Sequence, residues 1–99
     1  MLGLEIRPRA EADLASAWDY YEEQWPGLGE ELLLCVEAAF DMARSAPDWC
    51  PVVMGPVRRC LVRRFPYCVY FKVEVERIVV LAVYHSSRDP AGWQDRLAE

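Results

Sequence analysis

The residues best suited to chemistry gather in the second half of the chain. Four arginines lie within seven positions, at Arg58, Arg59, Arg63 and Arg64, and the only histidine, His85, follows a long apolar run. Guanidinium groups this close together create a strong local positive field, and each can hold a carboxylate or phosphate in a planar, bidentate contact. A simpler interpretation is also open, because charged side chains on a strand edge discourage sheet-to-sheet association. His85 could likewise titrate near neutral pH or only cap the end of a strand.

A second group of candidates follows the histidine. Arg88 could contact a partner or pair with Asp89, which could also cap a short helix. Trp93 could contact a partner, although its interpretation as a packing anchor for a final helix is the stronger one. If the protein has a target, we predict that its target-binding residues are Arg58, Arg59, Arg63, Arg64, His85, Arg88 and Trp93.

The sequence lacks the patterns that carry catalysis or hold a metal ion. It contains no paired carboxylates, no serine–histidine–acid set and no glycine-rich phosphate loop. The cysteines at 35, 50, 60 and 68 have no zinc-type spacing and mostly lie in apolar segments, which favours buried free thiols over disulfides. We therefore predict no catalytic residues, no metal and no cofactor.

Length and composition predict a single globular domain. Ninety-nine residues are too few for two independent cores, so the domain should span residues 1–99. A hydrophobic content of 54% excludes a disordered chain. The first ten residues lack the order of a signal peptide, and no apolar run is long enough to span a bilayer. These features predict a cytoplasmic protein without a membrane partner.

The charge is unevenly distributed along the chain. The net charge is −5, but residues 1–49 carry three basic and eleven acidic side chains, whereas residues 50–99 carry eight and five. Proteins that grip a nucleic acid over a wide surface are usually basic, because contacts with phosphates supply most of the affinity. The sequence therefore predicts no strong independent nucleic-acid binding, although a local contact at the arginine cluster remains open.

A small antiparallel sheet should position the candidate residues. Apolar side chains alternate through residues 67–75, the pattern of a strand with one buried face. Residues 78–84 are apolar throughout, as expected for a central strand covered on both faces. The short polar connection between these two runs predicts a hairpin. Residues 57–65 alternate less regularly, and Pro66 should interrupt pairing after them.

Two helices should cover this sheet. Residues 2–7 form a short strand candidate, which Pro8 ends. Residues 9–25 carry an apolar face made by Leu14, Trp18, Tyr21 and Trp25. Residues 28–46 carry another, made by Leu32, Val36, Ala39, Phe40 and Ala43. The link between these helices is short, which predicts an antiparallel hairpin.

The remaining segments complete an α+β domain. Residues 47–56 read as a proline-rich loop, and Asp89-Pro90 should open a short final helix that carries Trp93 and Leu97. The predicted order is an N-terminal strand, an antiparallel helical hairpin, a three-stranded antiparallel meander and a short C-terminal helix.

Specific motifs add a family resemblance to this outline. The segments RRFPYCVYFKV, AVYH and RDPAGW closely resemble the ParE/RelE superfamily of bacterial type II toxins, and the first helix and the proline after the second extend the resemblance over nearly the whole chain. The compact fold of that superfamily has the same element order. The resemblance implies a toxin that is held inactive by an antitoxin encoded beside it.

The resemblance also indicates a branch of the superfamily. Its mRNA-cutting members need cationic groups at the phosphate and a proton-transferring side chain. At three positions where those members carry arginine, arginine and tyrosine, this chain has Cys68, Ser87 and Trp93. The ParE branch, which poisons DNA gyrase without being a nuclease, therefore fits better. The alternatives are a ribosome-dependent mRNA endonuclease with a relocated site and a detoxified relative that only binds its antitoxin.

The implied antitoxin predicts a second interaction surface. Four tryptophans and five tyrosines in so short a chain should leave rings near the surface. We expect an amphipathic antitoxin helix in an apolar groove, with a strand added at the sheet edge as a further contact. The predicted antitoxin-binding residues are Trp18, Tyr21, Trp25 and Phe40.

Overall fold

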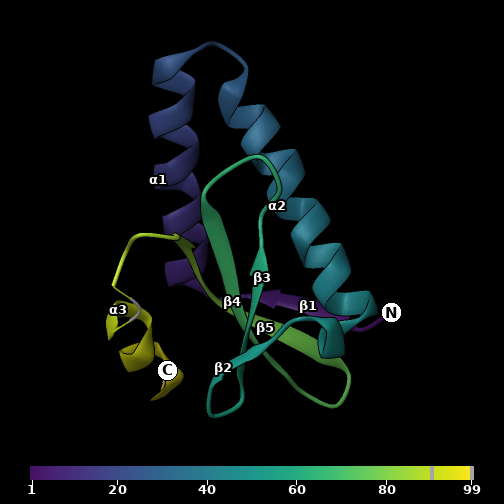
Figure 1. Ribbon diagram of the computed structural model, residues 1–99. Helices are drawn as coiled ribbons and strands as arrows, with labels where there is room; N and C mark the ends of the chain where they lie inside the picture. The colour runs from purple at the N-terminus through teal and green to yellow at the C-terminus, as the bar shows by residue number, and fades with distance from the viewer. Residues whose placement is uncertain (90, 99) are drawn as a thin grey trace.

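The computed structural model describes residues 1–89 and 91–98 and has the predicted α+β order (Figure 1). The elements are β1 (Gly3–Ile6), α1 (Pro8–Gln24), α2 (Leu28–Ser45), the 3-10 turn η1 (Pro47–Trp49), β2 (Val52–Met54), β3 (Val57–Leu61), β4 (Tyr67–Val73), β5 (Arg77–His85), α3 (Ala91–Gln94) and the 3-10 turn η2 (Asp95–Ala98). Among the described residues, none of the helices combines the length and the apolar character needed to cross a membrane.

The two long helices form the predicted antiparallel hairpin, and its tip rises beyond the sheet (Figure 1). Gly27 starts the second helix from a left-handed conformation, with φ of 91°, which glycine adopts at little cost. The Glu22 carboxylate accepts the Gly27 N–H at 2.9 Å and the Gly29 N–H at 3.0 Å. A Cβ atom on Gly29 would lie 2.8 Å from the Trp18 ring, so glycine here allows the two helices to pack closely.

The sheet has five strands in the order β1-β5-β4-β3-β2. The pairings of β3 with β4 and of β4 with β5 are antiparallel, which confirms the predicted meander. β1 pairs in parallel with β5, with Gly3 beside Arg77 and Ile6 beside Val80. As predicted, β5 is buried on both faces from Ile78 to Tyr84.

One strand lies where the sequence predicts only a loop. β2 occupies the proline-rich segment between Pro51 and Pro56, and Val52 pairs with Arg58 of β3. Three residues are too few for a periodic signal, so this strand follows from pairing and not from its own pattern. It makes β2, and not β3, the edge of the sheet.

Each face of the sheet has its own cover. α1 and α2 pack on the face that includes Val69, Phe71, Ile78 and Val80. The residues of the second cluster are Val57, Cys68, Tyr70, Val79, Leu81, Ala82, Tyr84 and Trp93, with Leu97 beside them. In Figure 1 the helical hairpin and α3 accordingly stand apart, on different sides of the strands.

This second cover overturns the prediction that β4 has one buried face. Cys68 and Tyr70, on the face expected to be mixed and solvated, are buried together with Trp93. Val73 and Val75, on the face expected to be buried, are exposed, and Val75 is 94% exposed. Val75 lies in the turn between β4 and β5, beyond the core.

The last helix begins at Ala91, and the Asp89 carboxylate accepts the Ala91 N–H at 2.9 Å. The side chain of Asp89 therefore stabilises the start of this helix, as the sequence predicts. The other half of that prediction concerns Pro90, which lies outside the described residues.

Candidate functional site

The four clustered arginines do not form one patch. Arg58 points toward the helical side, where it donates hydrogen bonds to the carbonyl oxygens of Pro47 at 3.4 Å and Cys50 at 2.9 Å. Arg59 lies on the opposite face of β3, next to Tyr70 of β4. Burial raises the pKa of Tyr70, whereas the charge of Arg59 and its hydrogen bond to the phenol lower it. Both side chains are half-buried and hold β3 to its neighbours, a role the sequence did not reveal.

Arg63 and Arg64 are the exposed members of the cluster. They lie in the turn between β3 and β4, where Arg64 adopts a left-handed backbone conformation with φ of 71°. The Arg64 guanidinium lies 3.3 Å from the Glu31 carboxylate of α2, but both side chains remain exposed to solvent. This turn therefore presents two solvated guanidinium groups near the helical hairpin.

His85, Arg88 and Tyr67 come together at one pocket. Its volume is about 320 Å³, and it lies between α1 and the end of β5. Tyr67 pairs with His85 in the sheet, and their rings meet edge to face at 5.3 Å. The Nδ1 atom of His85 accepts the Ser87 N–H at 3.1 Å, so the donor of the neutral ring is Nε2.

The pocket offers hydrogen-bond donors more than bases. Burial, followed by the nearby phenols of Tyr21 and Tyr20, raises the pKa of Tyr67, while the charge of Arg88 lowers it. Tyr67 therefore keeps its proton at neutral pH. The guanidinium carbon of Arg88 lies 3.9 Å from the centre of the Tyr84 ring, which holds the cation at the pocket.

The Asp13 carboxylate, which also lines this pocket, is already occupied. It lies 2.6 Å from one guanidinium nitrogen of Arg96 and 3.2 Å from another, and it accepts the Val83 N–H at 3.1 Å. Arg96 is 4% exposed and also donates to the Leu81 carbonyl at 3.1 Å. This ion pair ties the C-terminal segment to α1 and β5, so Asp13 is not available as a general base.

Trp93 is the most deeply buried of the predicted target-binding residues. It is 1% exposed, and its ring stacks on Tyr70 with centroids 4.9 Å apart. Gly92 makes this packing possible, because a Cβ atom there would lie 2.7 Å from the Tyr84 hydroxyl. The position supports the packing interpretation, and a direct contact with a target stays a prediction.

The predicted antitoxin-binding residues are dispersed as well. Trp18 packs over Gly29, and Tyr21 makes edge-to-face contacts with Phe65 and Tyr67. Trp25 directly follows α1 at the tip of the hairpin and is 70% exposed.

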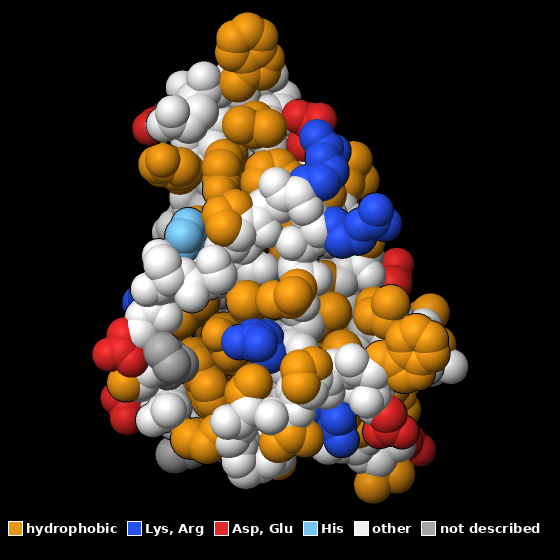
Figure 2. Space-filling model, in the orientation of Figure 1, with side chains coloured by type: hydrophobic (Ala, Val, Ile, Leu, Met, Phe, Trp, Pro, Cys, Tyr) orange, Lys and Arg blue, Asp and Glu red, His pale blue; other side chains and the backbone are white. Residues whose placement is uncertain are grey.

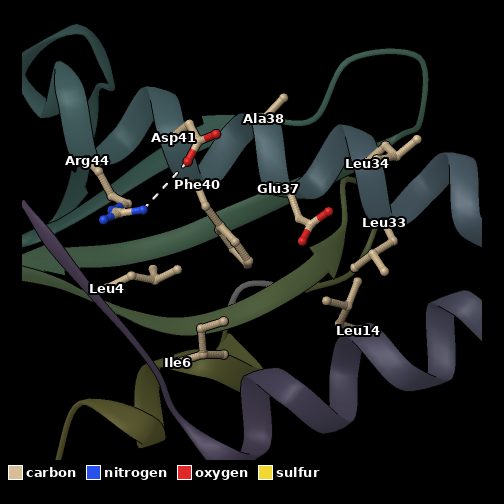
Figure 3. Close-up of a pocket in the computed structure, with 10 residues that line it drawn as sticks. All are labelled: Leu4, Ile6, Leu14, Leu33, Leu34, Glu37, Ala38, Phe40, Asp41 and Arg44. Atoms are coloured by element: carbon tan, nitrogen blue, oxygen red, sulfur yellow. Dashed lines mark ion pairs between the residues drawn. The ribbon is translucent and has the colours of Figure 1, made fainter. Parts of the chain in front are cut away.

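Phe40, the fourth of them, is buried at the edge of an apolar groove whose position the sequence did not reveal (Figure 3). The groove has a volume of about 590 Å³ and lies between β1, α1 and α2. Its lining residues are Leu4, Ile6, Leu14, Leu33, Leu34, Glu37, Ala38, Phe40, Asp41 and Arg44. The run Leu32–Leu34 was the available signal, because three adjacent leucines cannot all face one core.

The groove has an apolar floor and a charged rim. Leu34 is 66% exposed beside it, and the carboxylates of Glu37 and Asp41 lie along α2 (Figure 3). Arg44 lies 3.7 Å from Asp41 at one end, where its Nε also donates to the Leu2 carbonyl at 2.7 Å. The rim is therefore acidic with one paired cation.

On the face seen in Figure 2, lysine and arginine side chains appear as separate groups among hydrophobic side chains. Large exposed apolar side chains include Trp25, Leu34, Trp49 and Leu61. Within residues 1–89 and 91–98, no three histidine, cysteine or acidic side chains are grouped so as to hold a metal ion.

Comparison with known proteins identifies similar chains. Residues 4–90 match the family model described as the ParE toxin of the type II toxin–antitoxin system parDE. A solved structure described as the chromosomal ParDE toxin–antitoxin system from P. aeruginosa superimposes with a TM-score of 0.75 and 20% sequence identity. That superposition covers 86% of this chain and 96% of the other. No curated protein sequence matches the chain.

Proposed function

Since the chain belongs to the family of ParE toxins of type II toxin–antitoxin systems, we propose that it inhibits growth by contacting DNA gyrase and that its cognate antitoxin blocks this contact. The inhibition requires no chemistry of its own. It depends on a surface at the end of the sheet that presents Arg63, Arg64, His85 and Arg88.

The observation that carries the proposal is the burial of two key positions. Where the mRNA-cutting relatives carry a phosphate-binding arginine and a proton-transferring tyrosine, this chain has Cys68 and Trp93, which are 2% and 1% exposed. Neither side chain can reach a phosphate from the folded core, and an indole does not exchange a proton at neutral pH. Ser87, at the third position, carries no positive charge. A partner-binding mode of action is therefore favoured over RNA cleavage.

The proposed target surface combines charge with donors. Arg63 and Arg64 are exposed in the β3–β4 turn, and Arg88 stands over Tyr84 beside the His85 pocket. Guanidinium groups suit acidic protein surfaces and the DNA backbone held by gyrase, because they bind carboxylates and phosphates bidentately.

We further propose that the antitoxin occupies the apolar groove of Figure 3 through one face of an amphipathic helix. The exposed Leu34 and half-buried Leu33 supply apolar contacts, and the acidic rim favours basic residues beside the apolar stripe of the partner. The predicted contacts of Trp18, Tyr21 and Trp25 belong to the same hairpin, farther toward its tip.

The target is tested by inducing the protein in cells and by assaying the purified protein. Induction of the chain without the neighbouring gene, together with purified protein in a DNA supercoiling assay, should give DNA-damage signalling and loss of gyrase supercoiling. Transcripts cut at defined codons on ribosomes would instead establish the endonuclease alternative. A folded protein without any growth effect would establish the detoxified relative.

The surface is tested by a charge-matched pair of double variants. Arg63→Ala with Arg64→Asn should lower inhibition at least tenfold, and asparagine is chosen because it tolerates the left-handed backbone at position 64. Lys72→Ala with Arg77→Ala removes the same charge at the other end of β4 and should leave inhibition unchanged. Equal inhibition by both folded variants would place the target surface elsewhere.

The groove is tested by two exposed apolar positions. Leu34→Glu should weaken binding of the neighbouring gene product at least tenfold, or about 1.4 kcal/mol. Val75→Glu, in the turn between β4 and β5, is the control and should bind normally. Isothermal titration calorimetry with both folded variants would contradict the groove assignment if their affinities were equal.

A further inference from the structure

Two of the four free cysteines lie close to each other at the edge of the sheet, Cys60 in β3 and Cys50 in the segment between η1 and β2. Val52 pairs with Arg58, and the Arg59 N–H donates to the Pro51 carbonyl at 3.0 Å. Cys50 directly precedes Pro51 and Cys60 directly follows Arg59, so this backbone contact brings the two cysteines to neighbouring positions. Both cysteines are buried in the same hydrophobic cluster, under α1 and α2.

The two cysteines also line the same small pocket, and each is close enough to affect the ionisation of the other. Burial, followed by the charge of Cys50 and a hydrogen bond with it, raises the pKa of Cys60 to about 12. The Cys60 sulfur lies 3.6 Å from the Ala39 carbonyl oxygen, so its side chain points toward α2. A disulfide needs Cα atoms about 4.4–6.8 Å apart, a separation that the backbone contact between residues 51 and 59 makes accessible.

This pair can be reached from solvent through a small pocket. The pocket has a volume of about 250 Å³ and is lined by both cysteines, with Met42, Trp49 and Leu61 at its sides. Trp49 and Leu61 are largely exposed. The other two cysteines lie elsewhere: Cys35 is on α2, and Cys68 is on the opposite face of the sheet. The pocket therefore gives a small oxidant access to one particular pair of thiols.

We propose that Cys50 and Cys60 form a reversible oxidation site, a pair of thiols that hydrogen peroxide converts to a disulfide. The thiolate of one cysteine attacks a peroxide oxygen, the O–O bond breaks, one water leaves and a sulfenic acid forms. The second thiol attacks that sulfur, so that the S–S bond forms, the S–O bond breaks and a second water leaves. The two thiols lose two electrons and two protons in total, and hydrogen peroxide accepts them.

The disulfide has a defined structural effect. It joins the segment after η1 to β3, at the point where Arg58 already donates to the Cys50 carbonyl. Closing a short loop in the unfolded chain should raise the melting temperature by roughly 5–15 °C. The reaction should be slow at neutral pH and faster as the pH rises, because the Cys60 thiol is protonated until high pH.

The test uses the purified full chain, treated with hydrogen peroxide under native conditions. After removal of the peroxide, titration in denaturant should find two free thiols in place of four, and the intact mass should fall by two hydrogens. Trypsin cleaves after Arg44, Arg58, Arg59 and Arg63, so Cys50 and Cys60 fall in separate peptides. The oxidised protein should therefore yield those two peptides linked, and dithiothreitol should release them.

Matched variants make the test decisive. Cys50→Ser and Cys60→Ser should each abolish the linked peptides and the shift in melting temperature, whereas Cys35→Ser should retain both. Cys60→Ala serves if the buried hydroxyl of the serine variant prevents folding. Persistence of all four thiols in the folded protein, a link through Cys35 or Cys68, or conversion of a single cysteine to sulfinic acid would overturn the proposal.

Discussion

The two faces of the sheet are covered in opposite ways. One face lies under α1 and α2, whose 17 and 18 residues contribute buried side chains turn after turn. The other lies under α3 and η2, with four residues each, where one tryptophan and one ion pair make the main contacts. Stability on the first face is distributed over many side chains, whereas on the second it is concentrated in a few. Substitutions can test this contrast.

The largest effect is expected from breaking the buried ion pair. Asp13→Ala removes the carboxylate that lies 2.6 Å from the buried Arg96 guanidinium and should lower the free energy of unfolding by about 3–5 kcal/mol, measured by urea denaturation. Asp19→Ala, on the same helix but exposed, should change it by less than about 0.5 kcal/mol. Equal effects of the two variants would show that the C-terminal segment is not held by this pair.

The next largest loss of stability is expected when one large buried side chain is removed from either face. Trp93→Ala should cost about 4 kcal/mol, because the ring fills the space between Tyr70 and the C-terminal segment. Leu32→Ala, equally buried on α2, should cost about 3 kcal/mol, since neighbouring side chains on the helical face can relax into the space. Chemical denaturation measures both values. A larger loss of unfolding free energy in Leu32→Ala than in Trp93→Ala would contradict the difference inferred between the two faces.

A smaller effect comes from the two glycines at close contacts. Gly92→Ala should cost about 2 kcal/mol, because the added Cβ meets the Tyr84 hydroxyl at 2.7 Å. In Gly29→Ala the added Cβ meets the Trp18 ring at 2.8 Å, but alanine has a helix propensity about 1 kcal/mol more favourable than that of glycine. The net loss in the free energy of unfolding should therefore be about 1 kcal/mol. Thermal unfolding of the two variants sharpens the comparison. A stabilised Gly92→Ala protein would show that the C-terminal cover is loosely packed.

The smallest effect on stability is expected at the β3–β4 turn, which belongs to neither cover. Arg63→Ala should change the free energy of unfolding by less than about 0.5 kcal/mol, because the side chain is exposed. The same variant should reduce growth inhibition if the proposed target surface is correct. A marked loss of stability would instead give Arg63 a structural role and remove it as a probe of the target.

The spacing of apolar residues predicted the helices and strands in which burial follows directly from the position of each residue along the element. The stripe from Leu32 to Ala43 places α2 correctly, and the apolar run from Ile78 to Tyr84 identifies the central strand. Features that depend on distant partners were not predictable in this way. β2 exists because Val52 pairs with Arg58, and the second buried face of β4 exists because Trp93 stacks on Tyr70.

The candidate surfaces show the same limit. The sequence places four arginines close together, but strand alternation sends Arg58 and Arg59 to opposite faces of β3, and only Arg63 and Arg64 remain exposed. Aromatic composition pointed to the hairpin as an antitoxin surface. The groove beside it depends on β1 pairing with β5, which brings Leu4 and Ile6 to α2. No local pattern carries that information.

The parallel pairing of β1 with β5 also determines when the molecule can be completed during its synthesis. Gly3 is synthesised well before its partner Arg77, so β1 cannot complete its pairing until β5 has been made. The helical hairpin and the β3–β4 ladder can form earlier, because their contacts are closer in sequence. The groove floor made by Leu4 and Ile6 must wait for β5, so an antitoxin bound at the proposed groove would recognise the folded domain and not a chain in which β5 is still missing.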